Sequence, residues 1–166
     1  MKQVMLTFCV LAFLGCKNNN NSQSGNTVSQ DTNNPVREVP KDEQNHDNSP
    51  IYTNNWTTEI QLNNGEKWEA DATTNNGAQQ LENAINSMQP NSIKEYHELA
   101  KELNEVKNFL VKNCSMTGPA HDNLHIWLHP LIDKINALLI VDNLDDAKKL
   151  EQAITVNIEA YTQYFN

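Results

Sequence analysis

The chain has few cysteines, few basic residues and no long apolar run. Its 166 residues include 3 Cys, and 12 Lys plus Arg stand against 21 Asp plus Glu, for a net charge of −9. No basic cluster exists, so the chain lacks the electrostatic surface with which proteins bind nucleic acid, and we expect no nucleic-acid partner. Its longest apolar stretch, residues 4–14, is far shorter than the ~20 residues that a membrane-spanning helix needs.

Motifs of common catalytic chemistry are also missing. The chain has 5 glycines, and they form no Gly-rich phosphate loop. The sequence shows no recognisable Ser-His-Asp arrangement and no pair of carboxylates with catalytic spacing. The Cys-x-x-Cys-His motif of covalent haem attachment is absent. The sequence therefore predicts a binding or structural protein, not an enzyme.

The first residues have the pattern of an export signal. A positive charge at Lys2 precedes the apolar residues 4–14, and the small residue Gly15 follows them. A charged start, a short apolar region and a small residue at the boundary are typical of a secretory signal peptide. We therefore expect residues 1–15 to be removed on export.

The boundary Leu14-Gly15-Cys16 resembles the lipobox of bacterial lipoproteins, although Phe13 stands where that family prefers Leu. The resemblance implies that Cys16 is acylated and anchors the chain to a lipid bilayer in the cell envelope. Residues 17–21 lack the acidic run of some surface-exported lipoproteins of Bacteroidota, which favours a domain that faces the periplasm. The alternative is an ordinary secretory signal with Cys16 as a free thiol. If Cys16 is acylated, Cys114 has no partner for an internal disulfide.

The mature chain divides into a tether and one domain. Residues 16–50 are rich in Asn, Ser and Pro and almost free of apolar residues, so they cannot bury enough surface to offset their chain entropy. We predict a disordered tether there. Residues 51–166 have the length of a single domain and hold 8 Lys against 16 Asp plus Glu, a net charge of −8.

The domain is predicted to be mainly all-α, a four-helix up-down-up-down bundle preceded by a short β-hairpin. Asn63-Asn64-Gly65 is a turn signal, and a three-residue loop would place Ile60 opposite Trp68. Apolar residues then recur at spacings of three and four, which indicates amphipathic helices joined by short loops. The expected helices are residues 74–88, 92–114, 119–141 and 144–165.

One segment concentrates side chains that bind metals. Cys114 and Met116 precede a predicted helix on which His121 and His125 are four residues apart, so both imidazoles lie on one face. Sulfur and imidazole donors together suit copper, and the same donors hold zinc. The predicted metal ligands are therefore Cys114, Met116, His121 and His125. His129 continues the row, but Pro130 disfavours regular helix there, so His129 is left out.

Other interpretations of this segment stay open. Cys and Met often fill cores, so the segment is compatible with a structural cluster and with a non-metal module that docks an envelope protein. His121 to His125 also looks like the His-Glu-x-x-His motif of zinc proteases with Asp122 in the Glu position, but no third ligand follows. The pattern Cys-x-Met-x-Gly-x-Ala-His-x-x-Leu-His is similar to uncharacterised helical lipoproteins of Bacteroidota, and that similarity implies no activity.

Overall fold

The computed structural model describes residues 49–166, and the predicted signal peptide, Cys16 and nearly all of the predicted tether lie outside them. The described part is helical, which confirms the predicted four-helix bundle. Its elements are the 3-10 turns η2 (Pro50–Tyr52) and η3 (Asn55–Thr58), followed by α1 (Ala72–Ser87), α2 (Ile93–Asn113), α3 (Gly118–Leu138), α4 (Leu144–Glu159) and α5 (Tyr161–Tyr164).

Local side chains explain where the helices begin. Asp71, Ser92 and Asn143 each accept a hydrogen bond from a backbone N–H in the first turn of α1, α2 and α4. Such N-caps satisfy donors that have no partner within the helix. Helix α3 instead begins at Gly118, which adopts a φ of 66°, and Pro119 stands in its first turn. Polar residues with short side chains thus mark most helix starts in the sequence itself.

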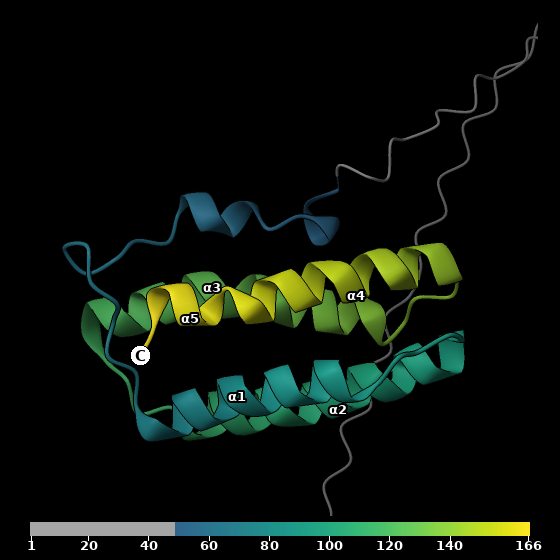
Figure 1. The fold of residues 1–166 in the computed structure, drawn as a ribbon, viewed down its shortest axis with the longest axis horizontal. Coiled ribbons are helices and arrows are strands. Elements are labelled where there is room, and N and C mark those ends of the chain that lie inside the picture. Colours follow the sequence, from purple (N-terminus) through teal and green to yellow (C-terminus); the bar gives the residue numbers. More distant parts are fainter. Residues whose placement is uncertain (1–48) are drawn as a thin grey trace, which may run out of the picture. The chain divides into compact units, whose positions relative to one another are not determined.

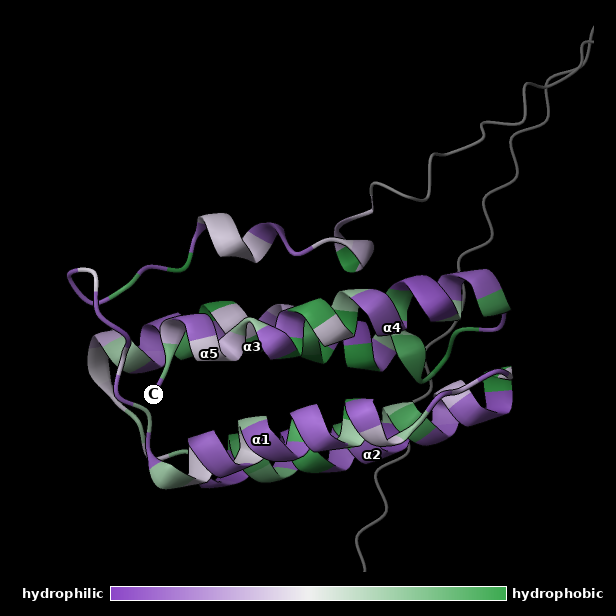
Figure 2. Cartoon of the chain, in the orientation of Figure 1, coloured by the Kyte–Doolittle hydropathy of each residue, from purple (hydrophilic) through white to green (hydrophobic). Residues whose placement is uncertain are grey.

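The helices pack as two layers, α1 beside α2 and α3 beside α4 (Figure 1). Apolar side chains of all four helices meet between the layers, and polar residues cover much of the outward faces (Figure 2). The fully buried core includes Leu81 of α1, Leu103 of α2, Trp127 of α3 and Ile154 of α4. Within residues 49–166, no helix combines the length and the apolar character needed to cross a membrane.

Two predictions about helices need correction. Pro130 does not interrupt the helix at His129 as expected, because α3 continues through both residues to Leu138. Buried Trp127, Leu128 and Leu131 flank the proline and anchor the helix on both sides of the lost hydrogen bond. The last predicted helix is not continuous, because α4 ends at Glu159 and the short α5 follows.

The predicted hairpin does not form strands. Residues 49–70 are here called the N-terminal strap. The strap runs along α3 and α4 on the side away from α1 and α2 and then passes the end of this layer to reach the start of α1 (Figure 1). A single antiparallel pair, Asn63 with Glu66, closes the turn. The two residues between them, Asn64 and Gly65, have φ of 54° and 92°. The expected three-residue loop is therefore wrong.

Contacts distant in sequence take the place of the second strand. The backbone N–H of Trp68 donates to the carbonyl of Tyr164 at 2.8 Å, and the N–H of Asn166 donates to the carbonyl of Trp68 at 3.1 Å. Farther along the strap, Asn54 Nδ2 donates to the carbonyl of Ala153 at 3.1 Å. The backbone N–H of Gln61 also donates to Asn123 Oδ1 of α3 at 2.9 Å. The strap is therefore held by α3, α4 and the C-terminal residues, and not by a second strand of its own.

Candidate functional site

The loop between α2 and α3 places the two predicted sulfur donors. The backbone N–H of Cys114 donates to the carbonyl of Leu110 at 3.0 Å and so extends the last turn of α2. Cys114 and Met116 are half-buried and pack against the hydrophobic core. Both sulfur-bearing side chains thus contribute to packing and retain some exposure.

Asp71 holds this loop against the start of α1. Its Oδ1 accepts the backbone N–H of Thr74 at 2.6 Å, and its Oδ2 accepts the N–H and the hydroxyl of Ser115 at 2.5 and 2.7 Å. Partial burial acts to raise the pKa of Asp71, but the hydrogen bonds from Ser115 and Thr74 together lower it well below its ordinary value. The carboxylate therefore fixes the loop that carries Cys114 and Met116.

Three histidines form a row along α3. The ring centroids of His121 and His125 are 4.2 Å apart, and those of His125 and His129 are 4.9 Å apart with an interplanar angle of 22°. The regular spacing of four residues brings each ring over the next. His129 belongs to the row because the helix continues past Pro130, so the expected break in the helix at His129 does not occur.

The protonated form of His125, the central imidazole of the row, is disfavoured. Partial burial and the two flanking rings, His121 and His129, lower the pKa of His125, and Asp122 only partly offsets this. Protonation of one ring would place its charge close to the neighbouring rings. His125 therefore favours its neutral form, in which a ring nitrogen can bind a metal ion.

The predicted ligands are only partly brought together. His121 and His125 are adjacent, whereas Cys114 and Met116 lie in the preceding loop. Among residues 49–166, no three His, Cys, Asp or Glu side chains form a group that could hold a metal ion. Cys114, His121 and His125 thus form no such group as their side chains stand.

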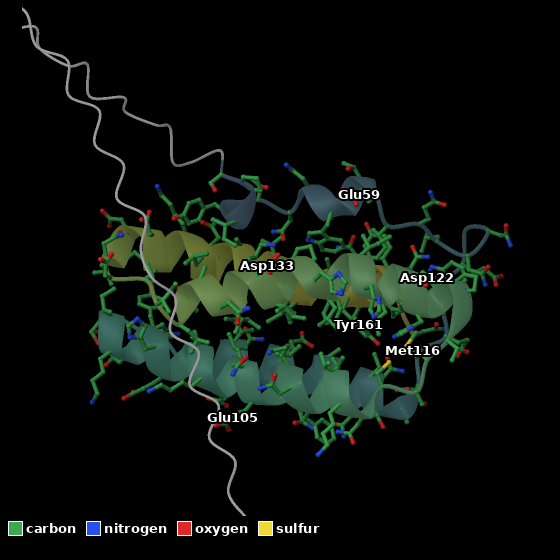
Figure 3. The ribbon with its side chains drawn as sticks, turned by 180° about the vertical axis from the view of Figure 1, so that it is seen from behind. Glu59, Glu105, Met116, Asp122, Asp133 and Tyr161 are labelled. Carbon is green, nitrogen blue, oxygen red and sulfur yellow. The ribbon has the colours of Figure 1, made fainter. Side chains whose placement is uncertain are left out.

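A cavity of about 430 Å³ lies between the N-terminal strap and α3. His125 and His129 line it from α3 together with Asp133, and Glu59 lines it from the strap. Figure 3 shows Glu59 on the strap and Asp133 on α3. We call this cavity the strap pocket. Its lining residues are Pro50, Ile51, Thr53, Asn55, Trp56, Glu59, His125, Ile126, His129, Pro130, Asp133 and Lys134.

Lys134 lies beneath the strap pocket and is almost fully buried, with 1% of its surface exposed. Its Nζ donates to Asn157 Oδ1 at 3.0 Å and to the carbonyl of Pro130 at 3.4 Å. Asn157 in turn exchanges hydrogen bonds with the backbone carbonyl and the indole N–H of Trp127. Burial lowers the pKa of Lys134 to about 8, although Asp133 acts to raise it. The ammonium group is thus directed into the interface of α3 and α4.

Comparison with known proteins adds nothing to this geometry. No family model, no curated protein and no solved structure matches the chain. The function of the site therefore follows from the chemistry of its own residues.

Asp133 and Glu59 of this region were not identified from the sequence. Asp133 extends the series His121, His125 and His129 at the same spacing of four, so the series itself was a signal that Asp133 shares their face. Glu59 lies far away in sequence, and no local pattern indicates that it lines the same cavity.

Proposed function

We propose that this chain is a membrane-anchored lipoprotein of the cell envelope whose helical bundle is a binding domain for copper or zinc. The anchor is an acylated Cys16, and the metal ligands come from the segment Cys114–His125. The proposal of an anchor rests on the short apolar run and on the lipobox resemblance at Leu14-Gly15-Cys16.

The observation that carries the metal proposal is the pair of imidazoles on α3. The rings of His121 and His125 have centroids 4.2 Å apart, so both can reach one ion. The two ring planes are tilted by 56° to each other, and Cys114 does not group with them as the side chains stand, so binding requires rotation of the side chains. His125 is exposed and His121 is half-buried, so the surrounding packing permits such rotation.

The preceding loop supplies donors of a different character. A Cys thiolate and a Met thioether are soft ligands that favour Cu(I), and thiolate with imidazole also suits Zn(II). The half-buried loop is held to α1 by Asp71, which keeps both sulfur-bearing residues near the beginning of α3. Two sulfur and two nitrogen donors would give a four-coordinate site.

Metal titration of the mature chain, purified in detergent from its own envelope, tests this function. We expect Cu(I) or Zn(II) to bind with a dissociation constant below about 1 µM, measured against competing chelators. The double variant Cys114→Ser/His121→Ala should weaken binding by at least about tenfold. The matched control is His97→Ala, because His97 lies on α2 with its Nε2 2.8 Å from the carbonyl of Val141, outside the proposed ligand set. Micromolar or weaker affinity, or equal binding by the double variant, refutes the metal proposal.

Mass spectrometry of the same preparation tests the anchor. The expected N-terminal residue is Cys16 with lipid on its sulfur. An intact segment 1–15, or an unmodified thiol at Cys16, refutes the proposed anchor and leaves the metal test unaffected.

A further inference from the structure

The strap pocket has the size and the walls of a small-ligand site. Its volume of about 430 Å³ falls within the range of pockets that hold small molecules. The apolar part of the wall comes from both sides, with Ile51 and Trp56 on the strap and Ile126 and Pro130 on α3. A ligand in this pocket can therefore bury an apolar body against both walls.

Two carboxylates of the pocket make no hydrogen bond and no ion pair within the part of the chain that the structure describes. Glu59 and Asp133 are both exposed, and neither carboxylate accepts a hydrogen bond from residues 49–166 or pairs with a cationic group at ion-pair distance. They come from opposite sides of the cavity, Glu59 from the strap and Asp133 from α3 (Figure 3). A positively charged group between the two walls would interact with both.

The other ionisable groups of the pocket leave this negative potential in place. Lys134 is the cationic side chain of the lining, but its Nζ is directed into the core, where Asn157 and the carbonyl of Pro130 accept its hydrogen bonds. His125 and His129 line the pocket with stacked imidazole rings. Anionic ligands are thus disfavoured, because they would meet two carboxylates without an available ammonium group.

The geometry favours an organic cation over a metal ion in this pocket. A metal site needs several donors that converge on one point, and the described residues contain no group of three His, Cys, Asp or Glu side chains that does so. An organic ammonium compound needs no such convergence. It can place a charged end near Glu59 and Asp133 and its carbon chain along the apolar walls, of which Trp56 is a part.

We propose that the strap pocket binds a small organic ammonium compound, with Glu59 and Asp133 as its charge partners and Trp56 as part of its apolar wall. Of the proposed metal ligands, His125 also lines this pocket, whereas Cys114, Met116 and His121 do not. Because the strap leads directly to the predicted tether, a ligand that contacts both walls would also hold the strap against α3.

Calorimetric titration of the mature chain in detergent tests this inference with three probes: putrescine, spermidine and choline. We expect at least one probe to bind saturably with a dissociation constant below about 1 mM. A parallel titration should show a change in the tryptophan fluorescence of the chain. The double variant Glu59→Gln/Asp133→Asn should weaken binding by at least about tenfold, because it removes both charge partners. Both positions are exposed, so these substitutions leave the core unchanged.

The matched control removes two carboxylates elsewhere. Glu102 and Glu105 are exposed on α2, and Figure 3 shows Glu105 on the far side of the bundle from Glu59. Glu102→Gln/Glu105→Gln should bind the probes as the parent chain does. Absence of saturable binding by all three probes overturns the inference, and so does equal weakening by the two double variants. Loss of zinc binding in Glu59→Gln/Asp133→Asn would also overturn it, in favour of a metal ion in the pocket. Because Cys114→Ser/His121→Ala should leave amine binding intact, failure of this inference is distinguishable from failure of the metal proposal.

Discussion

Replacement of Lys134 by methionine removes an ammonium group from the interface of α3 and α4 and keeps a long, flexible side chain in its place. Lys134 is 1% exposed, and its Nζ is held by an amide oxygen and a backbone carbonyl without an ion pair. An ammonium group that leaves water without a negative partner loses much of its hydration. The charge of Lys134 should therefore destabilise the folded chain, and the size of this effect should depend on pH.

The shift in pKa sets the magnitude. The pKa of Lys134 falls from its ordinary value of 10.5 to about 8, with burial as the main cause. Each unit corresponds to about 1.4 kcal/mol, so the charged form costs the fold about 3 kcal/mol. Between pH 8 and pH 10.5 the unfolded chain binds the proton that the folded chain has released, so stability rises with pH in this window. Below pH 8 both states bind the proton and the full cost remains.

Urea unfolding of the parent chain and of Lys134→Met between pH 7 and pH 10.5 measures this effect. The difference in unfolding free energy should shift by about 3 kcal/mol in favour of the parent chain as pH rises. The pH-dependent contributions of other groups are the same in both chains and cancel in this difference. The change in packing from Lys to Met is independent of pH, so it does not affect the shift. Lys101→Met, which removes an exposed lysine of α2, provides the baseline for the loss of one positive charge. A difference that stays constant across the window refutes the argument that Lys134 is a buried charge.

Two further changes test the packing and the loop. Gly77→Ala should lower the free energy of unfolding, measured in urea, by about 1–3 kcal/mol. The reason is that a Cβ at this position would lie 2.9 Å from Cβ of Leu110, where α1 and α2 approach each other. An unchanged urea midpoint would contradict a tight contact between the two helices at Gly77. Asp71→Ala should cost about 2–3 kcal/mol at pH 7, because it removes an N-cap and the charge-assisted bonds to Ser115. Since the pKa of Asp71 is lowered in the folded chain, its contribution is present above the ordinary pKa near 4 and is lost as pH falls below it, so the two chains should converge in acid. A gap between them that is independent of pH would contradict this role of the carboxylate.

The helices of this protein follow from local sequence. Periodic apolar residues placed four helices close to their observed positions, except that the last was predicted to continue to residue 165 and ends at Glu159, because such a pattern is a property of each segment alone. The pairing of His121 with His125 followed in the same way from a spacing of four on one helix. The turn at Asn64-Gly65 was also marked in the sequence, because few other residues adopt a positive φ without strain.

Only the tertiary structure decided what these segments contact. The strap pairs through Trp68 with the C-terminal residues instead of with itself, because an isolated ribbon is only marginally stable and the bundle supplies a surface to pack on. Burial of Lys134 beside Asn157, and the placement of Glu59 across a cavity from Asp133, likewise depend on how separate helices and loops pack. Contacts between residues far apart in sequence leave no local pattern, so the strap pocket becomes visible only in the folded chain.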